Sequence, residues 1–330
     1  LVDGIDATID GGTYTSATAD QAVFLVVNGG HLTITNAAVT KSGTPADAQA
    51  DSYNFYGTNS AIVVVGSGSS VSVTGSRVTT TSDGSNAIFA TATGAATVSG
   101  VEIATSGSSA RGLDATYAGT ITASNVSIHT LGAHCATLAT DRGNGTVTLT
   151  GTNTLVTEGE GSPLIYSTGV ISASGVTGSA KASEVIVVEG KNTATLTDST
   201  VSSAGTNAIM LYQSFSGDAA DPDATASHST LTMTGVALTH SGSGAALYAT
   251  NTTTTATLTR TTVTSSGAAV VKAAADRWGT SGANGGKLTL ALDATTLTGA
   301  TSADSVSTIA VSTADGGALS GSTSGSVTIA

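Results

Sequence analysis

The sequence repeats itself with a period of about 21 to 28 residues, and this repeat restricts the fold more than any other feature. Four consecutive units occupy residues 86–109, 110–134, 135–162 and 163–183. Each unit holds three short runs in which small apolar residues alternate with Ser or Thr, as in AIFAT, ATVSG and VEIAT of the first unit. Such alternation predicts half-buried strands, and the Gly, Asn or Ser-Gly between the runs predicts turns.

Three strands and three turns in each unit predict one coil of a right-handed parallel β-helix, which is an all-β solenoid. About eleven coils, stacked at the strand spacing of about 4.8 Å, would give a rod on the order of 50 Å long. We expect a single domain over residues 1–330, with an irregular first coil over 1–20. Immunoglobulin-like sandwiches need units of about 100 residues, and a left-handed β-helix needs a hexapeptide rhythm, so neither alternative fits.

Composition excludes several functional classes. Charged residues make up 10% and hydrophobic residues 39% of the chain, which argues against disorder. A net charge of −12 argues against a nucleic-acid partner, because such proteins carry basic faces. Cys135 is the one cysteine, so no intrachain disulfide and no cysteine-based metal site is expected.

Three insertions interrupt the repeat, at residues 43–59, 214–229 and 276–287. Insertions in solenoids form loops on one face and often carry function. The last two are predicted to follow the same turn of their coils, two coils apart, whereas the first follows a different turn.

The second insertion carries the acidic residues Asp218, Asp221 and Asp223. This run resembles a calcium loop only in its acidity, because Pro222 interrupts it and the ligand spacing of a calcium loop is absent. We therefore expect no cofactor and keep calcium as the weaker interpretation.

Alignment of the coils places Asp114, Tyr117, Asp141 and Arg142 on one face, with Leu138 in the same column as Asp114. Carboxylates on neighbouring coils would lie about 5 to 10 Å apart, which suits glycoside hydrolysis. An Arg or Tyr of this face would instead serve as the base in β-elimination on uronic acids. A solvated face with an Asp–Arg pair is the alternative that needs no function.

Aromatic residues near the turn insertions are candidates for a sugar-stacking platform, because aromatic rings offer large amphipathic surfaces. The predicted ligand-binding residues are Tyr166, Tyr212, Tyr248, Arg277 and Trp278. The alternative is that these side chains close gaps beneath long loops. Four glutamates are interpreted as turn and surface charges: Glu158, Glu160, Glu184 and Glu189.

The stretch SEVIVVEGKNTATLTDSTVSSAGTNAI at 183–209 resembles the repeats of secreted, adhesin-like right-handed parallel β-helix proteins. The resemblance covers nearly the whole chain, at the level of the coil pattern. The wider pectate-lyase-like superfamily includes pectate lyases, polygalacturonases and phage tailspikes, so the resemblance implies polysaccharide ligands. The N-T-D, D-D, G-H-G and R-I-K motifs of polygalacturonases and the Arg-bearing motif of pectate lyases are not found, which weighs against an enzyme.

The sequence thus predicts first an extracellular or cell-surface protein that binds extracellular polysaccharide or cell-surface glycan as an adhesin does. The second hypothesis is a polysaccharide lyase, epimerase or glycosidase, and the third is a self-assembling or ice-binding rod. A Thr-x-Thr ladder in the same register on every coil would favour ice binding. The Thr runs at 79–81 and 252–255 drift in register, so this hypothesis ranks last.

The two ends of the chain indicate what the terminal coils of the solenoid contact. Neither terminus shows an amphipathic helix that would cap the solenoid, so we expect end-to-end self-association or continuation into a longer chain. The chain begins at Leu1 and not at Met, as expected after removal of an export signal.

Overall fold

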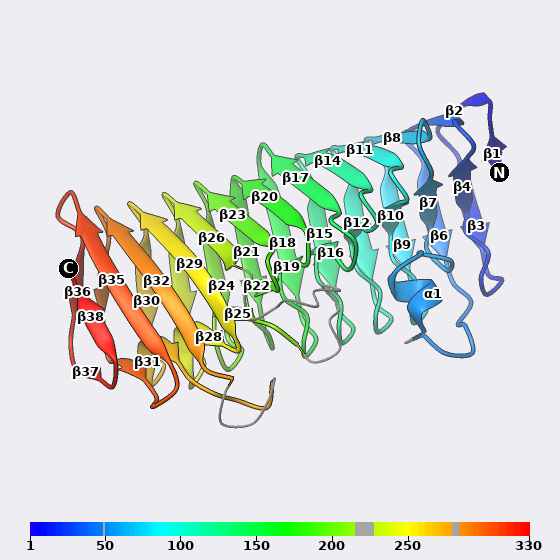
Figure 1. Ribbon diagram of the computed structural model, residues 1–330. Coiled ribbons are helices and arrows are strands. Elements are labelled where there is room, and N and C mark those ends of the chain that lie inside the picture. Colours follow the sequence, from blue (N-terminus) through cyan, green and yellow to red (C-terminus); the bar gives the residue numbers. More distant parts are fainter. Residues whose placement is uncertain (49, 215–227, 279–283) are drawn as a thin grey trace.

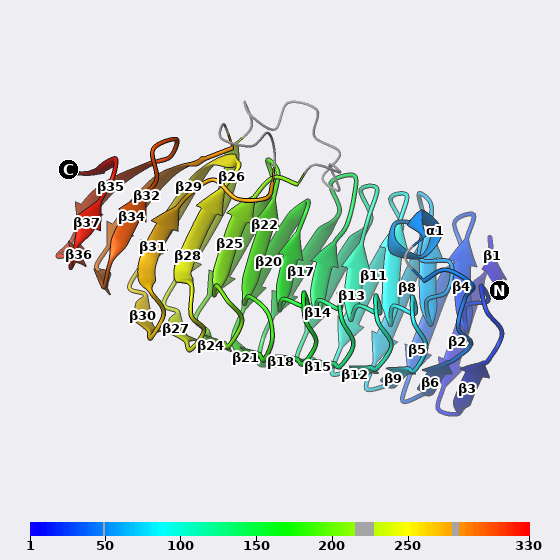
Figure 2. The ribbon, with the colours of Figure 1, turned by 90° about the horizontal axis from the view of Figure 1, so that it is seen from below.

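The computed structural model describes residues 1–48, 50–214, 228–278 and 284–330, and it shows a parallel β-helix (Figure 1). Most coils pass through three sheets, named here A, B and C in the order in which the chain meets them. The sheets run side by side along one axis, and the two termini lie at opposite ends of the rod (Figures 1 and 2). The chain makes about twelve turns, so the predicted fold is confirmed and the predicted eleven coils are close.

Sheet A carries the residues of the candidate site on its outer face. Within the described residues it has 13 parallel strands: β1 (Val2–Asp3), β4 (Phe24–Val27), β7 (Ile62–Val65), β10 (Ile88–Thr91), β13 (Leu113–Ala115), β16 (Leu138–Thr140), β19 (Ile165–Ser167), β22 (Ile186–Glu189), β25 (Ile209–Tyr212), β28 (Ala245–Thr250), β31 (Ala269–Ala273), β34 (Thr301–Ala303) and β37 (Thr323–Ser324).

Sheet B follows sheet A in every coil. Its 13 described strands are β2 (Asp6–Asp10), β5 (His31–Thr35), β8 (Ser70–Thr74), β11 (Ala95–Ser99), β14 (Thr120–Ser124), β17 (Thr146–Thr150), β20 (Val170–Ser174), β23 (Thr193–Thr197), β26 (His228–Thr234), β29 (Thr252–Thr259), β32 (Gly286–Asp293), β35 (Thr308–Ala314) and β38 (Val327–Ile329).

Sheet C closes each coil, and a separate two-stranded sheet continues its position at the C-terminal end. The ten described strands of sheet C are β3 (Thr13–Ser16), β6 (Ala38–Lys41), β9 (Arg77–Thr80), β12 (Glu102–Thr105), β15 (Ser127–Thr130), β18 (Asn153–Thr157), β21 (Val176–Ala180), β24 (Thr200–Ser203), β27 (Ala237–His240) and β30 (Thr262–Ser265). The separate pair is β33 (Thr296–Thr298) and β36 (Ala318–Ser320), and the short helix is α1 (Asp51–Asn54).

Stacked aliphatic side chains fill the interior of the rod. In sheet A the same inward position is held by branched or long apolar residues on successive coils: Ile62, Ile88, Leu113, Leu138, Ile165, Ile186 and Ile209. All of them are buried. One coil has no partner for its apolar face, so the burial that stabilises each coil comes from its two neighbours.

The first coil is more regular than the sequence predicts. Residues 1–20 contain β1, β2 and β3, which pair in parallel with β4, β5 and β6. The side chains of β2 and β3 alternate in exposure on strands whose backbones are paired.

Hydroxyl side chains form a continuous ladder on the outer face of sheet B. Ten successive coils present Thr or Ser at the same register position: Thr8, Thr33, Ser72, Thr97, Thr122, Thr148, Ser172, Thr195, Thr232 and Thr257. The Thr runs at 79–81 and 252–255 fall largely on different sheets, C and B, and therefore share no register. The ladder of sheet B contains two serines and ends at Ala291, so it is not the Thr-x-Thr ladder on every coil that would favour ice.

Candidate functional site

A groove of about 800 Å³ lies on the outer face of sheet A. At one end it is lined by Asn54 and Phe55 from the first insertion, together with Arg111. At the other end it is lined by residues 276–278, which begin the third insertion. Side chains of sheet A and of the turns that lead from sheet C into sheet A line the space between, so one continuous surface joins segments far apart in the sequence.

Six of the predicted site residues line this groove: Asp141, Tyr166, Tyr212, Tyr248, Arg277 and Trp278. The sequence separated them into a polar face and an aromatic platform, and the structure places both in one groove. Asp114, Tyr117 and Arg142, which the sequence offers as catalytic residues together with Asp141, are not among the residues that line the groove.

The predicted columns contain an error of one residue at β16. Asp114 pairs with Ala139, and Leu138 points into the core beside Leu113. The backbone N–H of Tyr117 likewise donates to the carbonyl of Arg142 and not to that of Asp141. The physical reason is that β16 is buried on both faces. Apolar and polar residues do not alternate in such a strand, so the sequence does not show which of its residues point into the core.

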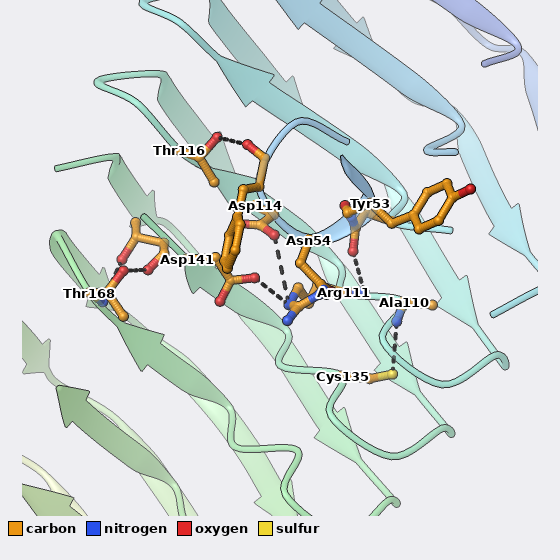
Figure 3. Close-up of polar contacts among 12 residues, drawn as sticks. Tyr53, Asn54, Ala110, Arg111, Asp114, Thr116, Cys135, Asp141 and Thr168 are labelled. Atoms are coloured by element: carbon orange, nitrogen blue, oxygen red, sulfur yellow. Dashed lines mark hydrogen bonds and ion pairs between the residues drawn. The ribbon is translucent and has the colours of Figure 1, made fainter. Parts of the chain in front are cut away.

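Arg111 nevertheless brings the two predicted carboxylates together (Figure 3). Its Nε lies 2.7 Å from Oδ2 of Asp141 and 3.8 Å from Oδ2 of Asp114. Its guanidinium also donates to Oδ1 of Asn54 at 2.7 Å, which ties the first insertion to this cluster. Asp114 is 0% and Asp141 2% exposed, so we name Arg111, Asp114 and Asp141 the buried carboxyl cluster.

The two acids of this cluster have different surroundings. Burial raises the pKa of the Asp114 carboxyl well above its usual range, and the neighbouring Asp141 carboxylate raises it further, while Arg111 opposes both. Only Asp141 of the two lines the groove. The pair therefore resembles the arrangement in which one carboxyl group holds a proton and its neighbour is charged.

The first insertion covers the outer face of sheet A beside the cluster. The Phe55 carbonyl accepts a hydrogen bond from Oγ1 of Thr116 at 2.7 Å, and the Arg142 guanidinium lies 3.9 Å from the centroid of the Phe55 ring. The rings of Tyr56 and Tyr117 stack at 5.2 Å with an interplanar angle of 14°. Tyr117 and Arg142 thus hold the insertion in place, which is why they do not face the groove.

A second buried carboxylate lies under the middle of the groove. Glu189, at the end of β22, is 0% exposed, so its interpretation as a turn or surface charge is wrong. The hydroxyls of Tyr166 and Tyr212 donate to its Oε2 at 2.5 and 2.9 Å, and Ser214 donates to its Oε1. A signal was present in the sequence: Glu189 ends the apolar run IVV, and a carboxylate in a buried strand needs donors.

Aromatic side chains form the far end of the groove. The rings of Tyr212 and Trp278 lie 4.9 Å apart at 56°, and the Arg277 guanidinium lies 4.6 Å from the centroid of Trp278. The Tyr248 hydroxyl donates to Oδ2 of Asp276 at 2.9 Å. Burial raises the pKa of Tyr248, and the Asp276 carboxylate raises it further, so this phenol is a neutral donor.

The positions of the second and third insertions agree with the sequence. Each follows a strand of sheet A and precedes one of sheet B, after β25 and after β31, which lie two coils apart. The acidic run at Asp218, Asp221 and Asp223 lies outside the described residues. In the part of the chain that is described, no cluster of three or more His, Cys, Asp or Glu is arranged to hold a metal, and no helix is long and apolar enough to cross a membrane.

The raised pKa of Asp114 predicts how stability depends on pH. Because the folded state holds this proton more tightly than the unfolded state, the contribution of Asp114 is fully present below about pH 4 and is lost as the pH rises through its folded pKa. We expect the free energy of unfolding of Asp114→Asn, relative to the natural protein, to increase as the pH rises from 4 to 8. Urea unfolding followed by circular dichroism measures this difference.

A surface aspartate provides the control for that measurement. Hydrogen bonds from Thr35 and Asn36 lower the pKa of Asp10, so its contribution is present above about pH 4 and is lost as the pH falls. The relative stability of Asp10→Asn should therefore change little between pH 4 and 8 and should increase as the pH falls below 4. Parallel profiles for the two variants would contradict the assignment of a raised pKa to Asp114.

Comparison with known proteins does not assign the chain to a family. No protein-family model, no curated protein and no solved structure matches the chain. The chain is a parallel β-helix, and its grouping with adhesin-like or pectate-lyase-like proteins stays a prediction.

Proposed function

We propose that the protein binds an extended extracellular polysaccharide or cell-surface glycan in the groove of sheet A, as an adhesin does. One observation carries the proposal: the tilted Tyr212–Trp278 pair and the polar Arg111–Asp141 end belong to the same groove. Aromatic rings pack against the apolar faces of sugars, and carboxylates and guanidinium groups bind sugar hydroxyls. This combination supports a carbohydrate ligand better than a purely apolar one.

The length of the groove favours a chain over a small molecule. Its lining extends from Arg111, beside β13, to residues 276–278, after β31. These strands are the first and last of seven neighbours in sheet A, and six steps of about 4.8 Å give about 29 Å. A glycan partner of this length supports an extracellular or cell-surface location, and the net charge of −12 helps keep such a protein soluble.

The proposal predicts retention on polysaccharide and a loss of affinity on removal of the aromatic end. We expect the protein to bind at least one member of a panel of insoluble neutral and acidic polysaccharides. Trp278→Ala should weaken that binding by about ten- to a hundred-fold, because an aromatic residue that packs against the ligand contributes about 1 to 3 kcal/mol. Depletion isotherms with the insoluble material measure both affinities.

Leu131→Ala is the control, since Leu131 is a large apolar residue, 49% exposed, that does not line the groove. Its binding should equal that of the natural protein. No retention across the panel, or equal losses in both variants, would contradict the proposed binding site.

The buried carboxyl cluster supports a second candidate, a polysaccharide lyase, epimerase or glycosidase. Asp114 with a raised pKa beside the charged pair of Asp141 and Arg111 resembles the paired acids of glycoside hydrolysis. The same incubations can be followed for new reducing ends and unsaturated ends. Their release, and its loss in Asp141→Ala, would support the enzyme over the adhesin.

The third candidate, an ice-binding or self-assembling rod, draws support from the hydroxyl ladder on sheet B. A solvated sheet face also carries small hydroxyl side chains, so the ladder alone does not favour ice over water. Ice binding and end-to-end association therefore stay predictions below the two glycan hypotheses.

A further inference from the structure

We propose that Tyr166 is a nucleophile in the floor of the groove, that Glu189 accepts its proton, and that the substrate is a glycoside. This inference rests on the proposed binding of a glycan and goes beyond it, because an adhesin needs no reactive group. Neither Tyr166 as a reacting group nor Glu189 as a buried base was predicted from the sequence.

The contacts of Glu189 fit the role of a fixed proton acceptor. Tyr166 is half-buried and lines the groove, and its hydroxyl donates to Oε2 of Glu189 at 2.5 Å. Tyr212 donates to the same oxygen and Ser214 to the other, so the carboxylate is held from both sides. A nucleophile within hydrogen-bond reach of a base, with that base oriented by further groups, is the arrangement by which hydroxyl nucleophiles are activated.

A proton donor lies one coil away, where Asp114 holds a proton beside Asp141. Ala139 pairs with Tyr166, and Asp141 stands two residues beyond Ala139. From the strand spacing and the rise per residue, the Cα atoms of Asp141 and Tyr166 are about 8 Å apart, which is within the span of one sugar ring and its leaving group. Asp141 also lines the groove, so a bound glycan can contact both side chains.

The reaction has two balanced steps. In the first, Oη of Tyr166 bonds to the anomeric carbon as the carbon–oxygen bond to the leaving sugar breaks; the phenol proton passes to Glu189, and the leaving oxygen takes, through Asp141, the proton that Asp114 holds. In the second, water attacks the anomeric carbon and returns a proton through Asp141 to Asp114, while the departing Tyr166 oxygen recovers its proton from Glu189. Tyrosine nucleophiles are a known exception to the usual carboxylate pair of glycoside hydrolases.

Phenylmethanesulfonyl fluoride tests the nucleophile without any glycan. The phenol oxygen bonds to sulfur, fluoride leaves, and Glu189 takes the proton. At pH 7 we expect Tyr166 to be sulfonylated at least about ten-fold faster than the exposed Tyr56, because general-base assistance is worth roughly 10²- to 10⁴-fold and outweighs the lower exposure of Tyr166. Peptide mass spectrometry measures both rates in one sample.

Two glutamate variants separate a proton acceptor from a structural partner. Glu189→Gln can still accept a hydrogen bond from the tyrosine hydroxyl but cannot take its proton, so Tyr166 labelling should become slow at pH 7 and rise only at alkaline pH, where the phenol ionises. Glu158→Gln is the matched control: its carboxylate accepts a hydrogen bond from Lys181, Glu158 does not line the groove, and labelling should be unchanged. Circular dichroism melting curves establish that both variants are folded, and Tyr166→Phe should carry no label at this position.

Labelling of Tyr166 no faster than Tyr56, or an unchanged pH profile in Glu189→Gln, would overturn the assignment. Because this test needs no glycan, its failure leaves the retention experiment standing. On a polysaccharide that the protein retains, release of reducing ends that Tyr166→Phe abolishes without loss of retention would support the glycoside as substrate. Retention with no release from that polysaccharide would overturn that part of the proposal.

Discussion

Replacing Arg111 by Met is expected to lower the free energy of unfolding by about 3 to 5 kcal/mol at neutral pH. The side chains of Arg111, Asp114 and Asp141 are 12%, 0% and 3% exposed, so the two acids have almost no water to replace the lost guanidinium. Removal of one partner from a buried ionic cluster leaves the others uncompensated, and that penalty exceeds the value of the pair itself. Urea unfolding curves followed by circular dichroism measure the loss.

Arg77→Met is the control for this prediction. Arg77 and Glu102 form an ion pair at 2.7 Å, but their side chains are 63% and 50% exposed, so its loss should cost no more than about 1 kcal/mol. The cost of Arg111→Met should also shrink at acid pH, where the carboxyl groups gain protons. Equal costs for the two arginine variants would show that the buried carboxyl cluster does not need its cation.

Replacing Leu138 by Ala is expected to destabilise the protein by about 2 to 5 kcal/mol. Leu138 is fully buried and stands between Leu113 and Ile165 in the apolar ladder of sheet A. The neighbouring coils fix the backbone spacing, so the cavity cannot collapse fully and its cost adds to the lost burial. Thermal and urea unfolding give the change.

Val170→Ala provides the comparison, because Val170 begins β20 with 43% of its surface exposed. Its truncation should change stability by about 0.5 kcal/mol or less. A cost for Leu138→Ala as small as that for Val170→Ala would mean that the described register of β16 does not hold.

The fold could be predicted because its signal is repeated in every coil. Alternation such as Thr-Ile-Thr-Ala in β14 and Thr-Val-Thr-Leu in β17 gives the same strand face coil after coil, and glycines or asparagines mark the turns. Where a strand is buried on both faces the alternation disappears. At β16 this loss produced the error of one residue between Leu138 and Ala139.

The candidate site was predictable in the parts that depend on coil order. Tyr212 and Trp278 meet because the second and third insertions follow equivalent turns, and spacing in the sequence reveals that. Tyr117 could not be assigned in this way, because its partner Tyr56 belongs to an insertion more than two coils earlier. Sequence periodicity gives the position of a side chain on its own coil but not the segment that packs over it.

Pairing between neighbouring turns also bears on how such a chain can change in evolution. Each strand of sheet A is bonded to the strand of the preceding turn and to that of the following turn. Duplication or loss of one whole turn between Arg111 and Trp278 would alter the separation of the polar and aromatic ends by about 4.8 Å and leave the chemistry of both ends intact. A single inserted residue within a strand would instead reverse the inner and outer faces of that turn. Changes of whole turns are therefore the tolerated route by which descendants of this protein could come to hold longer or shorter ligands.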